Sequence, residues 1–142
     1  MSETLIILKP DCIRRGLMGE VLKRLERKGV RFLRMRALQM TDKHIEGLYG
    51  KFKDEDFYKR ISEFMAGGLS VAGVAYVPHA IETSITTVRT LMGSFTAPQA
   101  GTIRGDLAKS PHHNIIHASD SPENAKREIE IFFPGYPGDV AM

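Results

Sequence analysis

The sequence predicts an α+β fold of the ferredoxin-like (split βαβ) kind, a sandwich in which helices pack on a four-stranded antiparallel sheet. Hydrophobic patterns follow one another as strand, helix, strand, helices, strand, helix, loop, strand, helix, which fits this fold. With 142 residues the chain can bury one core but not two comfortable ones, so residues 1–142 are expected to form a single domain. The composition, 42% apolar and 26% charged, is typical of a globular chain.

The first strand and helix are predicted from a short β-rich run and a helical repeat. Residues 4–8 favour a strand, and because Pro10 stops it, Lys9 is expected at the exit of a central strand. Apolar residues then recur at helical spacing as far as Gly29, which predicts a helix over residues 17–28.

Residues 30–40 predict a second strand with one wet face. Arg34 and Arg36 alternate there with apolar side chains, so the arginines are expected in solvent. The alternating apolar side chains are Leu33, Met35 and Ala37. Thr41 can then cap a short helix, and the acidic run 54–56 is expected to start another, where negative charge suits the helix dipole.

The middle of the chain predicts two helices around a buried strand. An amphipathic stripe over residues 57–65 indicates the first helix. The nearly continuous apolar run 69–77 predicts a strand buried on both faces. Helical spacing over residues 81–92, stopped by Gly93, predicts the second helix.

A long segment without periodicity precedes the last strand and helix. Residues 93–113 are rich in Gly, Pro, Ser and Thr, and loops of this length inside a compact domain are usually functional. Residues 114–117 predict the fourth strand. A last helix over residues 122–133 is expected to begin with Ser121 as N-cap and Pro122 in the first helical position.

Charge and cysteine content narrow the class of protein. The formal net charge of +3 gives little reason to expect nucleic acid or a membrane as partner. No apolar run is long enough to span a bilayer and no leader is apparent, so the cytoplasm is the expected location. The single Cys12 cannot staple the fold, which fits a reducing compartment.

His117 is the candidate for chemistry, because it follows two isoleucines at the predicted end of the last strand. On the next helix, Glu128 falls within the apolar stripe, where a buried charge needs a partner. Glu128 could accept a proton from one imidazole nitrogen and leave the other free as a nucleophile. It could equally reach the edge of the helix and cap loop amides. The spacing leaves both hypotheses open.

A metal site at the histidines is disfavoured by strand geometry. On a strand, His113 and His117 would lie about 13 Å apart along one face, too far for a shared zinc ion. His112 and His113, together with His44 and His79, are therefore expected at the surface.

A bound phosphate would have to be held by side chains. The chain contains neither GxxxxGK[ST] nor GxGxxG. Lys9, Arg89 and Arg104 could match a polyphosphate with a point charge and two guanidinium forks, and Thr96 lies in the same loop as Arg104. Taken singly, each cation is more often a solvated surface group.

Two other functions fit parts of the sequence. Gly16-Leu17-Met18-Gly19 matches the GxxG of KH domains, and with the basic first quarter it would suit an RNA-binding module. The histidines would suit a metal-dependent phosphohydrolase. Both alternatives rest on short or scattered features.

Four motifs together resemble a known family. Asn114-Ile115-Ile116-His117-Ala118-Ser119-Asp120-Ser121 matches the pattern NxxH[GA]SDS, Lys9-Pro10-Asp11 lies near the start, Gly101-Thr102-Ile103-Arg104-Gly105-Asp106 precedes the signature, and a glutamate follows the histidine by eleven positions. In this combination and order the chain resembles the nucleoside diphosphate kinases over essentially its whole length.

The resemblance implies a ping-pong enzyme that moves the γ-phosphate of a nucleoside triphosphate, typically ATP, onto a nucleoside diphosphate through a phosphohistidine. His117 would attack the phosphorus, and Glu128 would orient its ring with help from Ser119. Lys9 would contact the γ-phosphate and the ribose 3′-hydroxyl, with Tyr49 close by.

The resemblance also implies how substrates are held. Asn114 would bind the ribose 3′-hydroxyl, Arg89, Thr96 and Arg104 the phosphates, and Phe57 with Ile61 the base. Mg²⁺ would bridge phosphate oxygens with no direct protein ligand. A homo-oligomer is implied, a hexamer first and a tetramer second. Four features depart from the family pattern: Ala118 where glycine is commoner, an altered loop over residues 93–101, Pro111 near the base, and a short tail after Phe133.

Overall fold

The computed structural model describes residues 3–78 and 83–138 and contains one four-stranded antiparallel sheet in the order β2-β3-β1-β4. The strands are β1 (Glu3–Leu8), β2 (Arg31–Gln39), β3 (Leu69–Tyr76) and β4 (Ile116–Ala118). This order and these directions are those of a split βαβ fold, so the predicted fold class is confirmed.

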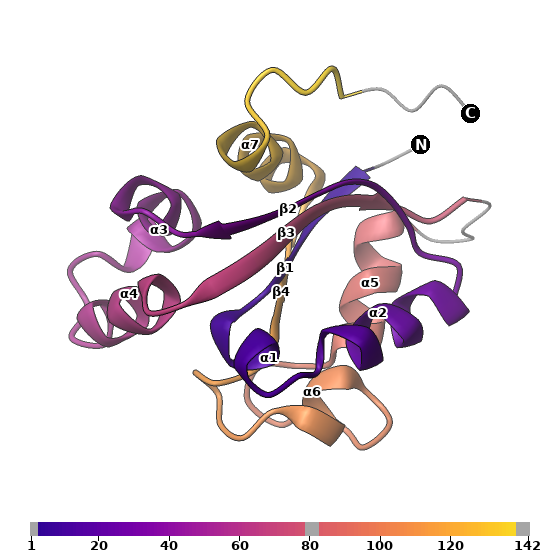
Figure 1. Cartoon of the computed structure of the whole chain (residues 1–142), viewed down its shortest axis with the longest axis horizontal. Coiled ribbons are helices and arrows are strands. Elements are labelled where there is room, and N and C mark those ends of the chain that lie inside the picture. Colours follow the sequence, from indigo (N-terminus) through magenta and orange to yellow (C-terminus); the bar gives the residue numbers. More distant parts are fainter. Residues whose placement is uncertain (1–2, 79–82, 139–142) are drawn as a thin grey trace.

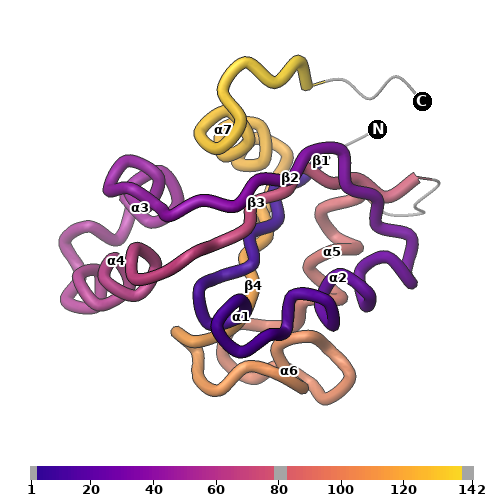
Figure 2. The backbone as a smooth tube through the Cα atoms, viewed as in Figure 1, coloured from indigo at the N-terminus to yellow at the C-terminus, as the bar shows by residue number. Residues whose placement is uncertain are grey.

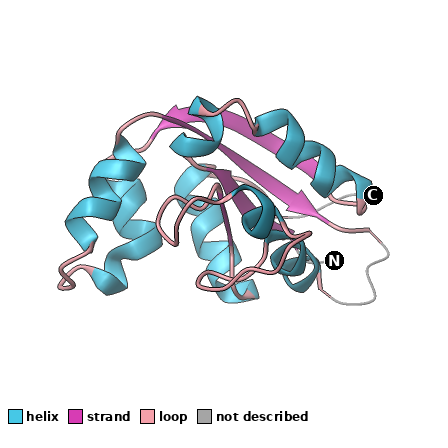
Figure 3. Ribbon diagram, turned by 90° about the horizontal axis from the view of Figure 1, so that it is seen from below, coloured by secondary structure: helices cyan, strands magenta, loops and turns pink. Residues whose placement is uncertain are grey.

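Helices cover both faces of the sheet (Figures 1 and 3). The helices are α1 (Pro10–Arg14), α2 (Met18–Arg27), α3 (Asp42–Tyr49), the 3-10 turn η1 (Gly50–Phe52), α4 (Tyr58–Ala66), α5 (Ser84–Met92), α6 (Ile103–Leu107) and α7 (Pro122–Phe132). Figure 1 shows α7 on one side of the sheet and α2 with α5 on the other, while α3 and α4 extend from its end.

Alternation along β1 explains the two layers of core. Ile6 and Leu8 belong to the cluster packed by α2 and α5, whereas Leu5 and Ile7 belong to the cluster packed by α3, α4 and α7. Both sets are almost fully buried, as expected for a central strand with helices on both faces. β3 is likewise buried along nearly its whole length, as predicted.

Two short helices, α1 and α6, were not predicted from the sequence. Pro10 begins α1 at its first position instead of simply ending β1, and α6 lies inside the segment predicted as a long loop. Each helix has five residues, too few to show a hydrophobic period. Figure 2 shows them at the same end of the sheet, where Arg15 Nη1 donates to the carbonyl of Leu107 at 2.7 Å.

The arginine face of β2 is exposed as predicted, but the strand has no buried face over residues 34–37, because Met35 and Ala37 are exposed as well as Arg34 and Arg36. Met35 is 43% exposed, while Arg36 Nη1 donates to the carbonyl of Phe132 at 2.9 Å and the Arg34 guanidinium lies 5.3 Å from the ring centre of Tyr136. The strand lies at the sheet edge, where long arginine side chains can reach the carbonyl end of α7, and a bulge near Leu33 shifts the register.

Other boundaries differ in smaller ways. The acidic run 54–56 lies in the turns before α4, not in its first turn. β4 begins at Ile116, two residues later than predicted, because Ile115 has a φ of 76° and interrupts extended backbone. The surface position expected for His79 and the start of the helix predicted over residues 81–92 lie outside the described residues.

None of the helices formed by the described residues is both long enough and apolar enough to cross a membrane.

Candidate active site

Strand register directs His117 toward the helices α3 and α7. His117 pairs with Ile7 of β1, so the two side chains lie on the same face of the sheet. Ile7 packs in the core beneath α3 and α7, whereas the neighbours of His117 on β4, Ile116 and Ala118, pack on the opposite face. The imidazole is therefore presented between α3 and the start of α7.

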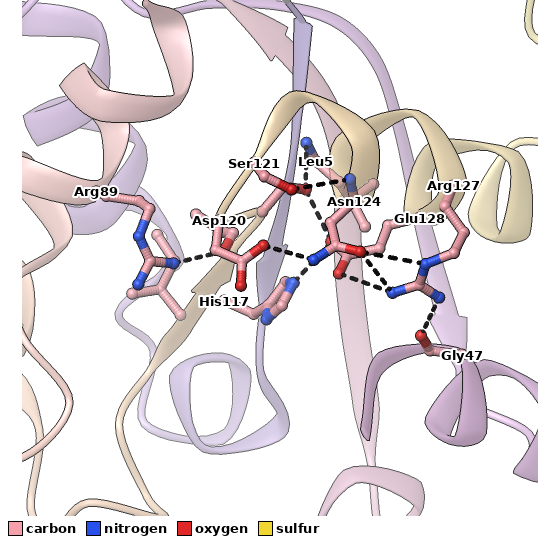
Figure 4. Close-up of polar contacts among 12 residues, drawn as sticks. Leu5, Gly47, Arg89, His117, Asp120, Ser121, Asn124, Arg127 and Glu128 are labelled. Carbon is pink, nitrogen blue, oxygen red and sulfur yellow. Dashed lines mark hydrogen bonds and ion pairs between the residues drawn. The ribbon is translucent and has the colours of Figure 1, made fainter. Parts of the chain in front are cut away.

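The His117 ring is held by Glu128 of α7. Its Nε2 lies 3.0 Å from Glu128 Oε1, and the same oxygen accepts a hydrogen bond from Ser119 Oγ at 2.8 Å (Figure 4). Since a carboxylate can only accept, Nε2 carries the proton in the neutral ring and Nδ1 keeps its lone pair. The pairing matches the first of the two hypotheses for Glu128.

Ser119 is fixed by the central strand. Its Oγ accepts from the Leu5 amide at 3.3 Å, and its own amide donates to the Leu5 carbonyl at 3.1 Å. With the hydroxyl oxygen occupied as acceptor, its hydrogen is directed at Glu128. Burial raises the pKa of Glu128, but the hydrogen bonds from His117 and Ser119, together with nearby positive charge, lower that pKa overall.

The start of α7 aligns these groups. Ser121 caps the helix by accepting from the Asn124 amide at 3.1 Å, and Pro122 occupies its first position, both as predicted. Arg127 ties α7 to α3, because its Nη1 donates to the Gly47 carbonyl at 2.5 Å and its Nη2 lies 3.7 Å from Glu128 Oε2.

Lys9 and Asn114 form a buried polar pair behind the histidine. Lys9 Nζ donates to Asn114 Oδ1 at 2.6 Å, and both residues are more than nine-tenths buried. Burial, together with the positive charge of Arg104, lowers the pKa of Lys9 to about 7, while the charge of Asp11 opposes that shift. The ammonium is therefore poised to lose its proton near neutral pH.

Tyr49 joins Lys9 to His117. The tyrosine ring centre lies 6.0 Å from Lys9 Nζ and 6.3 Å from the His117 ring, which meets it edge-on at 78°. Burial raises the pKa of Tyr49, so that its hydroxyl stays protonated. The hydroxyl is thus available as a hydrogen-bond donor beside the histidine.

Two arginines use backbone carbonyls around β4 as supports. Arg104 Nη2 donates to the Ile116 carbonyl at 2.7 Å, and Arg89 Nη1 donates to the Ala118 carbonyl at 3.0 Å. Burial lowers the pKa of Arg104 to about 10, which leaves it charged at neutral pH. Each guanidinium keeps further N–H groups for an anion.

A pocket of about 500 Å³ opens over His117 and collects cations. Of the predicted residues it is lined by Tyr49, Arg89, Arg104, His117 and Glu128. Lys51 and Arg127 add two further positive charges. The volume and charge suit the phosphates of a nucleotide.

A family model described as nucleoside diphosphate kinase matches residues 2–137. The chain belongs to the nucleoside diphosphate kinase family. A nucleoside diphosphate kinase of Thermomicrobium roseum is 44% identical over 135 residues, which are 94% of this chain and 88% of that protein. One of Methanococcus maripaludis is 43% identical over 136 residues, covering 94% of this chain and 98% of that protein.

Solved structures of the family share the fold. The nucleoside diphosphate kinase from Encephalitozoon cuniculi superimposes with a TM-score of 0.89 at 31% identity, covering 100% of this chain and 95% of that one. The enzyme from Aquifex aeolicus gives a TM-score of 0.84 at 31% identity, covering 94% of this chain and 96% of that one.

In this member of the nucleoside diphosphate kinase family, four more of the predicted residues lie in two adjacent hollows, whereas Lys9 and Ser119 are buried and line neither the pocket nor these hollows. Thr96 and Asn114 line one of about 230 Å³, which shares Arg104 with the main pocket. Phe57 and Ile61 line another of about 200 Å³. Neither Thr96 nor Phe57 lines the pocket over His117, so a substrate contacting all of them must extend across three hollows.

The sequence analysis missed several pocket residues. Phe95 lines both the main pocket and the hollow of Thr96, and it lies edge-on to His112 at 5.9 Å. His112 was expected at the surface; it is exposed, but its ring also faces that of Phe57 at 6.1 Å and 23°. Phe95 lies within the segment singled out as functional, which was the one signal available. No feature of the sequence indicated that Lys51 or Arg127 would line the pocket.

The acidic side chains near the pocket are the groups of this chain that could contact a divalent cation. Members of the family use divalent cations. Within residues 3–78 and 83–138, however, no three His, Cys, Asp or Glu side chains come together as a metal site. Asp120 lines the main pocket but accepts from Asn124 at 2.7 Å, and Glu128 is engaged by His117.

Proposed function

We propose that this chain is an active nucleoside diphosphate kinase, a phosphotransferase that moves the γ-phosphate of a nucleoside triphosphate, typically ATP, to a nucleoside diphosphate by a ping-pong mechanism through phospho-His117. The observation that carries the proposal is the 3.0 Å contact between His117 Nε2 and Glu128, which leaves Nδ1 free beside a pocket lined by cations.

In the first half-reaction, the Nδ1 lone pair of His117 attacks the γ-phosphorus in line. The nitrogen–phosphorus bond forms as the bond from the γ-phosphorus to the β–γ bridging oxygen breaks, and the nucleoside diphosphate leaves with that electron pair. Glu128 stabilises the positive charge that develops on the ring through Nε2–H. The second half-reaction reverses these steps toward the acceptor diphosphate.

Charge and hydrogen bonds support the assignment of the substrate residues. Lys9 would bind the γ-phosphate and, with Asn114, the ribose 3′-hydroxyl, while the Tyr49 hydroxyl donates beside them. Arg89, Thr96 and Arg104 would bind phosphates. Phe57 and Ile61 would sandwich the base, and stacking on Phe57 tolerates every base because each has a π face.

Mg²⁺ is the divalent cation we propose. It would be held by phosphate oxygens of the nucleotide, and when bound it neutralises charge on those oxygens. The residues that would face this complex are Arg89, Arg104 and Asp120, which line the pocket over His117.

The same proposal extends to the organisation of the protein. Residues 1–142 would form a single domain, supported by two core clusters that share one sheet. The cytoplasm suits a chain whose only cysteine, Cys12, is buried with its pKa raised to about 12 by burial. A homo-oligomer, a hexamer before a tetramer, would be identified by its mass in light scattering.

Steady-state transfer between ATP and a second nucleoside diphosphate tests the function. A ping-pong enzyme gives parallel double-reciprocal lines, and His117→Ala should abolish transfer. The matched control His44→Gln keeps an acceptor for the Thr41 amide at the start of α3, outside the pocket over His117, and should retain transfer. Nucleotide hydrolysis without an acceptor, or tight RNA binding without turnover, would contradict the proposal.

A further inference from the structure

We propose that Asp11 is a positioning residue for phosphoryl transfer, because its carboxylate holds the strained turn at Ile115 that sets the path of the chain into His117. The inference rests on the proposed function and adds to it a residue that touches neither the histidine nor the pocket over it.

The turn at Ile115 is a γ-turn. Ile115 has a φ of 76°, and no other described residue besides glycine has a positive φ. The Ile116 amide donates to the Asn114 carbonyl at 2.8 Å, the i to i+2 hydrogen bond of this turn. A β-branched residue in this conformation is strained and persists only where its surroundings impose it.

Both polar groups of the Ile115 backbone are held by the segment that follows β1. Asp11 Oδ2 accepts from the Ile115 amide at 3.1 Å, and the Lys9 amide donates to the Ile115 carbonyl at 2.9 Å. Ile115 itself is fully buried. Without Asp11, the amide of this buried residue would lose the acceptor that the structure gives it.

Burying the charged carboxylate of Asp11 costs more free energy than is needed to provide an acceptor for the Ile115 amide. The residue is 7% exposed, and its Oδ1 has no hydrogen-bond partner among the described residues. A neutral amide side chain could accept the same hydrogen bond without burying a charge. The charge has a use beside Lys9, whose pKa it raises against the effect of burial.

The residues on either side of the turn are substrate residues or their supports. Asn114 precedes it and accepts from Lys9 Nζ at 2.6 Å; Ile116 follows it and its carbonyl accepts from Arg104 Nη2 at 2.7 Å. His117 comes next. If Ile115 relaxed to a negative φ, the Ile116 carbonyl and the His117 side chain would rotate with the backbone. The imidazole would then no longer be aligned for attack on the phosphorus.

Single-turnover phosphorylation of the full chain by ATP separates the two roles of Asp11. Asp11→Ala should lower the rate at saturating ATP by roughly ten- to a hundredfold, the cost of a misplacement of about 1 Å. Asp11→Asn keeps an acceptor for the Ile115 amide, so its rate at saturating ATP should be close to that of the wild type. The ATP concentration that gives half of this rate should rise, because the negative charge beside Lys9 is lost. Equal saturated rates for Asp11→Ala and wild type would overturn the inference, and so would an Asp11→Asn as slow as Asp11→Ala.

A second pair of backgrounds shows whether Asp11 acts through the turn. Ile115→Ala and Ile115→Gly both remove the side chain from the core, but only glycine adopts a positive φ without strain. Adding Asp11→Ala should therefore slow phosphorylation severalfold more in the Ile115→Ala background than in the Ile115→Gly background. Equal slowing in both would contradict the inference. A folded wild type that never takes up phosphate would instead refute the proposed function, and this inference with it.

Discussion

At the scale of single residues, the site depends on a buried carboxylate. Glu128 is 4% exposed and lies on the apolar face of α7, which helical periodicity predicted from the sequence. What the sequence left open was its partner, because two hypotheses fitted the same spacing. The 3.0 Å contact with His117 decides the geometry, while the catalytic role stays a proposal.

Glu128→Gln should lower the rate of phosphorylation and leave nucleotide affinity nearly unchanged. An amide can still accept from Nε2–H, but it carries no charge to stabilise the imidazolium that develops during attack. We expect a loss of about ten- to a thousandfold, as for other removals of a group that stabilises transition-state charge. Single-turnover labelling gives the rate and equilibrium titration gives the affinity; an unchanged rate would mean that Glu128 is only structural.

Lys9 should make nucleotide affinity depend on pH. Its pKa is lowered to about 7, so the ammonium is present below that pH and is lost above it. Anionic phosphates prefer the charged form, and affinity should therefore fall as pH rises through about 7, in the limit by about 1.5–3 kcal/mol for a charge-assisted hydrogen bond.

The measurement for Lys9 is equilibrium binding of ATP to His117→Ala, which cannot react. Lys9→Met in the same background provides the control, because methionine has no proton to lose. This variant should bind ATP more weakly, and its affinity should not fall as the pH rises through about 7. If both variants showed the same pH dependence across neutrality, Lys9 would not be the titrating group.

At the scale of elements, long periodic segments were predictable and short ones were not. α2, α5, α7 and β3 follow hydrophobic repeats and differ from prediction by a few residues at their ends. The γ-turn at Ile115 leaves no mark in the sequence, because it is imposed by contacts with Lys9 and Asp11. The same holds for β2, where the alternation of side chains did not predict the contacts of its arginines with α7 and Tyr136 or the exposure of Met35 and Ala37.

The helix α6 sets a steric limit beside Arg104. Thr102 Oγ1 accepts from the Gly105 amide at 3.0 Å and donates to the Gln99 carbonyl at 2.6 Å, which closes the loop tightly. A Cβ on Gly105 would overlap the Gln99 carbonyl oxygen and lie 2.8 Å from Thr102 Oγ1. The loop can accept a side chain there only by moving.

Gly105→Ala should therefore destabilise the protein by about 1–3 kcal/mol, the usual cost of overpacking, and lower kcat/KM by displacing Arg104. Denaturant unfolding and the transfer assay measure the two effects. Gly19→Ala is the matched control: it lies in α2 with open space around the added Cβ, and should be neutral or slightly stabilising. Equal behaviour of the two variants would contradict this account of the loop.

At the scale of the whole molecule, the site is assembled from distant parts of the chain. Lys9 follows β1, Tyr49 ends α3, Arg104 lies in α6 and Glu128 in α7, and only the fold brings them to His117. Spacing could suggest Glu128, which follows His117 by eleven positions, but it could not bring Lys9, Tyr49 and Arg104 to the same histidine. The family resemblance could, since its motifs name positions that the fold unites.

The packing of helices in the whole molecule also explains why some pocket residues were not predicted from the sequence. Arg127 and Lys51 are ordinary solvated cations in their local sequence, and they line the pocket because α3 and α7 meet there. Phe95 lines it from the segment between α5 and α6. Motif matching therefore identified the residues close to His117 better than it identified the other residues that line the pocket.

The central claim is that His117 carries the phosphate. Incubation with ATP labelled at the γ-position, followed by denaturation, tests it directly. We predict a label that is labile in acid and stable in alkali, that leaves when a nucleoside diphosphate is added before denaturation, and that is absent from His117→Ala. A folded wild type without label, or a label that persists in His117→Ala, would contradict the account.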